Sequence, residues 1–282
     1  MCLKVSLFDK KLREEVFQNF GILSTLLSVI VIFVDIPQKW KLLSGIIFLI
    51  VLVLIYMYKW YRSNKLQSVT IRIGNSDIDI KVGDIFRQNG LKVIAFNEYF
   101  DTQVDNRIIS EKSLNGQFIK KYVTDVTILD KVIAEDRNVK ENLLCVNNSR
   151  LEGKTSKYQL GTSVIFEDEF ILTAFSKFNE NNEAELTMPE YVNFLLNFWD
   201  NVNRLYAQRS VVVPVLGSGI TRFKNGFEDV DINELLQIMI WTFRVSKIKF
   251  AFPAKLTIVI HKGLIDRVDL YNIGRMNNGI SE

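Results

Sequence analysis

Two runs without a charged side chain dominate the first quarter of the sequence. They cover residues 16–34 and 42–58, which is 19 and 17 residues. A helix rises about 1.5 Å per residue, so these runs reach roughly 25–29 Å, just enough to cross the hydrocarbon core of a bilayer. The middle of the second run, 46–55, is apolar on every face, whereas a surface helix of a soluble protein has a polar stripe. We therefore predict membrane spans at about 16–36 and 42–60.

The residues that flank the two runs indicate their orientation. Four basic residues precede the first run, two lie in the short connection and three directly follow the second. By the positive-inside rule, both termini and the rest of the chain are expected in the cytoplasm. Residues 1–65 then form a membrane hairpin in contact with the lipid bilayer. A buried hairpin of a soluble protein is the alternative, and a signal peptide fits poorly because Glu14 and Glu15 precede the apolar run.

The pattern changes after residue 65 and predicts one α/β domain over 66–282. Alternating or β-branched apolar residues predict strands at 69–73, 78–82, 91–96, 164–166, 170–175, 210–215 and 256–261. Helix N-terminal signals at Thr187 with Glu190 and at Asp231 with Glu234 predict two helices, and residues 112–122 predict a third. Strands interleaved with helices indicate a mixed sheet. Residues 123–160 give no clear prediction.

Charge and composition exclude several classes of function. Residues 1–65 carry a net charge of +5 (nine Lys and Arg against four Asp and Glu), whereas residues 66–282 carry −2 (26 against 28). The larger part lacks the basic excess that neutralises nucleic-acid phosphates, so we expect no nucleic-acid partner. Two cysteines and one histidine are too few for a Cys- or His-rich metal site, and we expect none. We expect His261 to be structural, Cys145 to be a buried or inert thiol, and Trp199 and Trp241 to lie in the core.

Two glycine-containing turns directly follow predicted strands. The first is Gly83-Asp84-Ile85 and the second is Leu216-Gly217-Ser218-Gly219-Ile220. Glycines let a ligand approach the backbone closely, and successive amide N–H groups form an anion-binding nest. The second turn is neither a P-loop nor a dinucleotide fingerprint, because both of those spacings are absent. Each turn alone is also explained as a simple bend of the chain.

Taken in order, these pieces resemble the macro domain, a three-layer α/β/α module with a mixed sheet that binds ADP-ribose. The resemblance covers about 66–265, and it implies that the turn of Asp84 and Ile85 binds adenine and that the turn at 216–220 binds the diphosphate. Residues 93–97 match a family motif whose last residue is retained as Asn97, expected at the distal ribose, with a strand-end cap as the alternative. Arg222 is expected to pair with a phosphate or a ligand carboxylate, with a surface arginine as the alternative.

The first phosphate loop departs from the family pattern. The family has a run of glycines where this chain has Ser113-Leu114-Asn115-Gly116-Gln117, with a single glycine. Catalytic macro domains rely on residues in and around that loop, and no counterparts are recognisable here. We therefore expect a binding protein with no catalytic residue and no required cofactor, in which Asn115 and Gly116 line the remaining side of the ligand.

Two N-terminal spans, a short linker and a divergent macro domain also resemble the ThsA effectors of type II Thoeris antiphage systems. The resemblance implies that a TIR-domain partner consumes NAD on infection and makes a signal nucleotide, an ADP-ribose derivative that is a histidine conjugate in the type II systems. It further implies a bacterial cell-membrane protein that forms a homo-oligomer on binding the signal, disrupts the membrane and kills or arrests the infected cell. The alternatives are a membrane-anchored ADP-ribosyl hydrolase, an ADP-ribose-binding scaffold, and a passive scaffold whose degenerate pocket binds no nucleotide.

Overall fold

The computed structural model describes residues 4–34, 37–246, 248, 250 and 253–276, and it divides into two compact units. The first unit is formed by Met1–Val69 together with Asp266–Glu282, and the second by Thr70–Ile265. From the sequence we expected a single boundary near residue 65, with everything after it in one domain. The structure instead groups the C-terminal segment with the two N-terminal helices.

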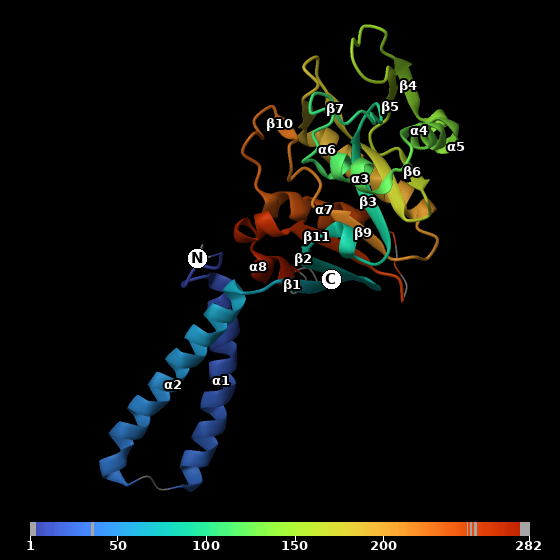
Figure 1. The fold of residues 1–282 in the computed structure, drawn as a ribbon. Helices are drawn as coiled ribbons and strands as arrows, with labels where there is room; N and C mark the ends of the chain where they lie inside the picture. Colours follow the sequence, from blue (N-terminus) through green and yellow to red (C-terminus); the bar gives the residue numbers. More distant parts are fainter. Residues whose placement is uncertain (1–3, 35–36, 247, 249, 251–252, 277–282) are drawn as a thin grey trace. The chain divides into compact units, whose positions relative to one another are not determined.

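The first unit is built on two long helices, α1 (Lys10–Phe33) and α2 (Gln38–Asn64), which run in opposite directions (Figure 1). Both are long and apolar enough to cross a membrane, and most of their apolar side chains are exposed. Helix α1 begins before the predicted span because Asp9 caps it, accepting a hydrogen bond from the Leu12 amide at 2.9 Å. Residues 35–36, where the first predicted span ends, lie outside the described residues.

A buried asparagine at the end of α2 holds the segment that precedes α1. Asn64 is 5% exposed, and its Oδ1 accepts hydrogen bonds from the backbone amides of Lys4 and Val5 at 2.8 and 3.0 Å. Trp60 donates its indole N–H to the Val5 carbonyl at 3.0 Å. Lys4 and Val5 are therefore fixed to the end of the hairpin.

The Glu15 carboxylate of α1 contacts both α2 and the C-terminal segment that contains the short helix α8 (Leu270–Gly274). Glu15 accepts a hydrogen bond from the Tyr271 hydroxyl at 2.8 Å. It also forms ion pairs with Lys59, at 2.7 Å, and with Arg275. These contacts explain why the C-terminal segment belongs to the helical unit.

The second unit is built on a nine-stranded sheet and a separate two-stranded ribbon. The strands of the large sheet are β1 (Ser68–Ile73), β2 (Ser76–Gly83), β3 (Leu91–Asn97), β6 (Ser163–Phe166), β7 (Phe170–Phe178), β8 (Ala184–Thr187), β9 (Val211–Pro214), β10 (Arg222–Lys224) and β11 (Leu256–His261). The ribbon pairs β4 (Leu143–Val146) with β5 (Ser156–Tyr158) in antiparallel fashion. All seven predicted strands are present, and the mixed sheet is confirmed.

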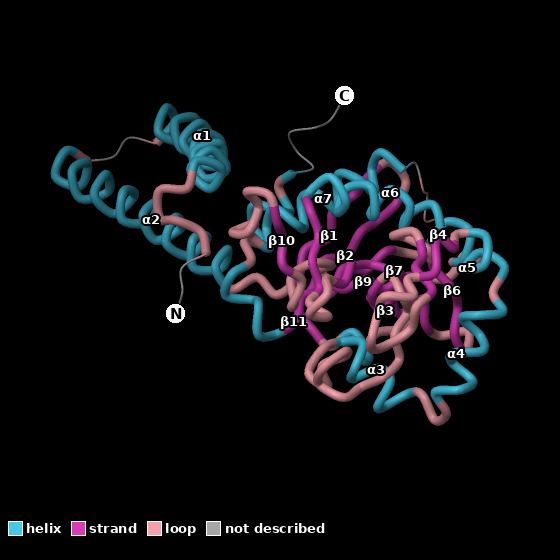
Figure 2. The backbone as a smooth tube through the Cα atoms, turned by 90° about the horizontal axis from the view of Figure 1, so that it is seen from above, coloured by secondary structure: helices cyan, strands magenta, loops and turns pink. Residues whose placement is uncertain are grey.

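Helices cover both faces of the large sheet. The helices of this unit are α3 (Leu114–Tyr122), α4 (Val126–Glu135), α5 (Arg137–Glu141), α6 (Met188–Leu205), α7 (Ile232–Ser246) and the 3-10 helix η1 (Ile85–Arg87); the 3-10 helix η2 (Lys262–Arg267), which follows β11, has no buried residue. Figure 2 shows α6 and α7 on one face and α3 on the other, which gives the three-layer arrangement. The predicted capping box of α6 is present, because Thr187 and Glu190 exchange side-chain-to-backbone hydrogen bonds at 3.4 and 2.8 Å.

Five central strands run parallel to one another. In the spatial order β2, β11, β9, β3 and β7, each neighbouring pair is parallel. The three valines at 211–213 are fully buried, as expected of a strand covered on both faces. The carboxyl ends of all five strands therefore meet at one edge of the sheet.

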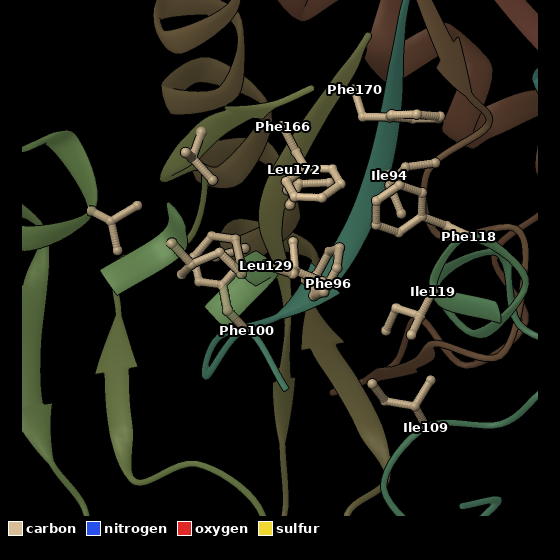
Figure 3. Close-up of a cluster of buried hydrophobic side chains, with 14 of the residues drawn as sticks. Ile94, Phe96, Phe100, Ile109, Phe118, Ile119, Leu129, Phe166, Phe170 and Leu172 are labelled. Carbon is tan, nitrogen blue, oxygen red and sulfur yellow. The ribbon is translucent and has the colours of Figure 1, made fainter. Parts of the chain in front are cut away.

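An aromatic cluster holds α3 on its face of the sheet (Figure 3). Phe118 of α3 is fully buried, and its ring centroid lies 6.2 Å from that of Phe96, 6.0 Å from that of Phe166 and 4.8 Å from that of Phe170. Aromatic pairs at these separations contribute about 0.5–1.5 kcal/mol beyond the area that they bury. The cluster fixes the position of the loop that leads into α3.

The structure contradicts the core position expected for Trp241 and the buried reading of Cys145, while the inert reading of that thiol stays a prediction. Trp199 is fully buried as predicted, but Trp241 is 56% exposed. It lies between the buried positions Met239 and Phe243 of α7, and at about 100° per residue it points to the opposite side of that helix. Cys145 is exposed as well, because it lies on the ribbon and not in the large sheet.

A buried ion pair anchors the segment between α5 and β6, for which the sequence pattern made no prediction. Arg150 donates to both carboxylate oxygens of Asp101, at 2.6 and 3.2 Å, and the two side chains are 8% and 1% exposed. The guanidinium carbon also lies 4.0 Å from the centroid of the Tyr99 ring. Gly153, with φ of +86°, permits this approach, because a Cβ there would lie 2.7 Å from Asp101 Oδ1.

A second buried carboxylate lies beside this pair. Glu98 is 1% exposed, pairs with Lys157 at 3.2 Å and accepts a bond from the Phe178 amide at 3.4 Å. Burial raises the pKa of the Glu98 carboxyl above its ordinary value, although the ion pair with Lys157 opposes the shift. Ionisation of Glu98 is therefore less favourable in the folded protein than in the unfolded chain.

We predict that Arg150→Met lowers the free energy of unfolding by about 3–5 kcal/mol, because it leaves the buried Asp101 carboxylate without its partner. Urea unfolding of the full-length protein in detergent, followed by circular dichroism, measures this loss. Arg137→Met is the matched control, since Arg137 makes an exposed ion pair with Glu141. A midpoint for Arg150→Met equal to that of the control contradicts the prediction.

We also predict that Glu98→Gln changes how stability depends on pH. Between the unfolded pKa near 4.5 and the raised folded value, the native protein binds more protons than the unfolded chain, so the contribution of Glu98 to stability falls as pH rises. Glutamine removes this dependence, and the variant should gain stability relative to the wild type as pH increases through that window. Unfolding midpoints measured across pH 4–8 give the stability of the variant minus that of the wild type, and a difference that falls with rising pH is the contrary result.

Candidate functional site

The predicted ligand residues lie on loops that follow the parallel strands. Asp84 comes directly after β2, the turn at 216–220 follows β9, and Asn97 ends β3. Strand β11 separates β2 from β9 and ends at His261, which is exposed and accepts a hydrogen bond from the Gly263 amide. In open α/β sheets, the carboxyl edge of the parallel strands is where ligands bind. The topology thus brings residues far apart in sequence to one edge.

The Asp84 carboxylate is oriented by its own turn. It caps η1, accepting a hydrogen bond from the Phe86 amide at 3.0 Å, and its side chain remains 44% exposed. Arg87 lies 3.7 Å away in an exposed ion pair. Ile85, predicted with Asp84 as a ligand residue, is 6% exposed and packs with Val212 and Val259 below the edge. Asp84 therefore presents its carboxylate from a fixed base, while Ile85 anchors that base.

The turn after β9 is buried at its start and exposed at its end. Leu216 is 2% exposed, and its carbonyl accepts a hydrogen bond from the buried Tyr191 hydroxyl at 2.9 Å. Burial raises the pKa of Tyr191, so this hydroxyl stays protonated and remains a donor. Gly217 has φ of +86°, and a Cβ there would lie 3.0 Å from the Phe223 ring. Ser218 closes the turn by donating to the Val215 carbonyl at 2.6 Å.

The exposed end of this turn offers backbone donors. Gly219 is exposed, a Cβ there would meet no atom within 4 Å, and Ile220 is 66% exposed. Within the part of the chain that the structure describes, the amides of Gly219 and Ile220 donate to no acceptor. Adjacent free amides in a glycine turn are the arrangement that binds anions. The predicted anion nest is thus open to a ligand.

Arg222, the predicted phosphate or carboxylate partner, is engaged within the protein. It begins β10 and forms an ion pair with Glu183, at 2.5 Å, with 60% of its side chain exposed. A hydrogen bond from Asn179 and the charge of Arg222 hold the pKa of Glu183 below its ordinary value. A ligand that uses Arg222 has to share it with Glu183 or displace that carboxylate.

Asn115 and Gly116 occupy the first turn of α3. Ser113 caps this helix, accepting from the Gly116 amide at 3.0 Å. Gly116 is required by packing, because a Cβ would lie 2.2 Å from the Ser110 carbonyl oxygen. Asn115 is 8% exposed, and its Oδ1 has no donor among the described residues. A buried amide oxygen without a donor costs about 1–3 kcal/mol, which a donor from a ligand offsets.

Asn97 has the capping arrangement that we weighed as the alternative to ligand binding. Its Oδ1 accepts from the amides of Tyr99 and Asp101, both at 3.1 Å, and its Nδ2 donates to Asp101 Oδ2 at 2.8 Å. At 4% exposure, only the second Nδ2 hydrogen is left for a ligand. Asp101 and Arg150 therefore hold Asn97 in place. Sequence reasoning missed both, because the three residues lie up to 53 positions apart and no motif joins them.

Metal chemistry finds no support in the described part of the chain. Those residues contain no group of three or more His, Cys, Asp or Glu side chains placed to hold a metal ion. The chemistry that the edge does offer is a carboxylate, a pair of backbone donors and a buried amide oxygen. These groups suit a ligand with hydrogen-bond donors at its ends and an anion in its middle.

Comparisons with known proteins identify the family. A family model described as the macro domain of Thoeris protein ThsA matches residues 78–261. Thoeris protein ThsA of Bacillus amyloliquefaciens (strain Y2) is 39% identical over 280 residues, which cover 94% of this chain and 91% of that protein.

Solved macrodomain structures of Oceanobacillus iheyensis are also similar. One mutant of that macrodomain is 14% identical, and the match covers 75% of this chain and 97% of the macrodomain chain with a TM-score of 0.48. A structure of the macrodomain with ADP is 16% identical, and the match covers 75% of this chain and 94% of the macrodomain chain with a TM-score of 0.43. The family model spans well over half of the chain, and the Bacillus relative matches nearly all of it. The chain therefore belongs to the Thoeris ThsA family and carries the macro domain of that family.

Proposed function

We propose that this Thoeris protein is a membrane-bound antiphage effector whose macro domain senses an ADP-ribose-derived signal. The observation that carries the proposal is the turn at 216–220, whose exposed end presents two free backbone amides at the carboxyl edge of the parallel strands. A diphosphate is the anion that suits such a nest. The resemblance to macro domains supplies the rest of the ligand, an ADP-ribose derivative made by a TIR-domain partner.

The ligand is expected to lie along the edge of the sheet. The half-exposed Asp84 carboxylate accepts a hydrogen bond from the adenine amino group, and the Gly219 and Ile220 amides donate to the diphosphate. The unpartnered Asn115 Oδ1 takes a ligand hydroxyl or N–H donor. Arg222, shared with Glu183, reaches a phosphate or a carboxylate on the derivative. A histidine conjugate supplies such a carboxylate.

We propose binding without catalysis. Gly116 lies in the first turn of α3, where a Cβ would lie 2.2 Å from the Ser110 carbonyl oxygen, so this segment has one closely packed glycine where the family has a run of glycines. Asn97 is committed to the cap at the end of β3. Turnover of an ADP-ribosylated protein by the purified chain is the outcome that favours a hydrolase, and no binding of any nucleotide favours a scaffold.

We further propose that α1 and α2 span the bacterial membrane, with both termini and the macro domain in the cytoplasm. Exposed apolar side chains cover both helices, and neither helix has an Asp, Glu, Lys, Arg or His within 16–34 or 42–58. A two-helix hairpin does not enclose a pore alone, so the damaging state is a homo-oligomer. A ligand drives that state only by binding it more tightly than the resting one.

We predict that Gly219→Val weakens nucleotide binding at least tenfold, about 1.4 kcal/mol. The position is open, so the fold tolerates a side chain, but the branched group covers the adjacent amides. Titration calorimetry of the full-length protein with ADP-ribose and its histidine conjugate measures the effect. Gly219→Ala adds one methyl group at the same point and should bind more tightly than valine. Wild-type affinity in the valine variant rejects the anion nest.

We also predict that Asp84→Ala abolishes phage protection in cells that carry the complete Thoeris system, because adenine loses its hydrogen-bond acceptor. Asp125→Ala is the matched control: Asp125 also caps a helix, accepting from the Thr127 amide at 2.8 Å, but it precedes α4, away from the strand ends. Plaque counts and growth after infection provide the readout. Protection that is equal in the two variants argues against an adenine site at Asp84.

A further inference from the structure

A groove in the helical unit runs along one side of α2. It has a volume of about 730 Å³, within the range of roughly 300–1,000 Å³ that is usual for ligand sites. Glu15 of α1 borders its polar end. From α2, Val51, Leu54 and Ile55 form its apolar part, and Lys59 and Arg62 lie at its polar end. Spacings of three and four residues place these side chains on one face of the helix. The groove thus passes from an apolar to a cationic lining over about three helical turns.

The two basic side chains at the polar end differ in the ion pairs that they form. Lys59 pairs with Glu15 at 2.7 Å, and Glu15 is further engaged by Tyr271 and Arg275. Arg62 is exposed, and its guanidinium forms no ion pair or hydrogen bond within the described part of the chain. The groove therefore has an unpaired arginine at one end and only hydrocarbon at the other.

This combination fits one kind of occupant. A guanidinium binds phosphate through two parallel hydrogen bonds, and the apolar wall beneath it accommodates an alkyl chain. A second copy of α2 is a poorer occupant, because residues 38–64 contain no Asp or Glu to face Arg62. An anionic phospholipid supplies both the phosphate and the alkyl chain, at the depth where an apolar span meets the cytoplasmic surface.

We propose that this groove is a binding site for an anionic phospholipid, with its phosphate on Arg62 and an acyl chain along Val51, Leu54 and Ile55. The inference rests on the proposed membrane placement of α1 and α2. It assigns α2 a role beyond crossing the bilayer. The lipid fills the space beside the junction at which Glu15 joins α1, α2 and α8, so membrane composition affects the resting arrangement of the hairpin.

The test uses the full-length protein reconstituted in vesicles of phosphatidylcholine with a minor share of fluorescent phosphatidylglycerol, read by energy transfer from the native tryptophans. The wild type is expected to enrich the anionic lipid over fluorescent phosphatidylcholine. Arg62→Gln should reduce that enrichment about fivefold, equivalent to about 1 kcal/mol for one basic residue at the surface. Leu54→Trp fills the groove without a change of charge, and native mass spectrometry should show less retained phosphatidylglycerol.

Two matched controls keep the test specific. Arg13→Gln removes an exposed arginine of α1, and Leu49→Trp adds the same bulk at an exposed position of α2 that does not line the groove; both should retain the wild-type preference. Equal enrichment in Arg62→Gln and Arg13→Gln, or equal retention in Leu54→Trp and Leu49→Trp, overturns the proposal. Displacement of the lipid by inorganic phosphate also overturns it, because the groove is then a site for a free anion.

The outcome separates this inference from the proposed function. A wild-type protein that fractionates with membranes but shows no lipid preference rejects the groove site alone. A protein that remains in the soluble fraction rejects the membrane placement and the lipid site together. Wild-type dimers that cross-link through α2 and are lost in Leu54→Trp, without lipid enrichment, assign the groove to a second copy of the chain and overturn the lipid proposal.

Discussion

The common direction of five strands is the constraint on which the candidate site depends. Since β2, β11, β9, β3 and β7 run parallel, the chain leaves each of them at the same edge of the sheet. That requirement places Asp84, the turn after β9 and the end of β3 on one rim. The helices on the two faces bury both surfaces of the sheet and keep that rim rigid. The loops can then vary without loss of the fold.

The helical unit depends on a different kind of interaction. An unpaired Glu15 carboxylate would be energetically costly in apolar surroundings. Its ion pairs with Lys59 and Arg275 provide the compensating charge, and Tyr271 donates a hydrogen bond to it. Because two of these partners come from the end of the chain, the second unit is an insertion within the first in sequence terms. The segment Thr70–Ile265 is therefore attached to the helical unit through both of its ends. A structural change in the inserted domain can therefore reach the hairpin through either of its two chain connections.

Much of the fold could be predicted, because hydrophobic periodicity and helix caps are local signals in the sequence. The valines at 211–213 and the capping box at Thr187 each lie within a few residues, and the structure contains both features. Contacts between distant polar residues have no such signal. The pair of Arg150 with Asp101 spans 49 positions, and the contact of Glu15 with Tyr271 spans 256. The sheet brings the first pair together, and the return of the chain end brings the second.

The site residues show the same limit of prediction from sequence, because their contacts within the protein have no local signal. A family motif indicates that Asn97 lies near the ligand, and Arg222 follows the turn at 216–220, but neither position indicates what else binds these side chains. In the structure, Asn97 caps the end of β3 and Arg222 pairs with Glu183. A ligand that engages Arg222 must therefore offset the loss of an exposed ion pair, which contributes little because solvent screens both charges. That small cost makes Arg222 a usable contact, whereas withdrawing Asn97 leaves two buried amides unpaired, at about 1–3 kcal/mol each. Discrimination among nucleotides is thus more easily carried by Arg222 than by Asn97.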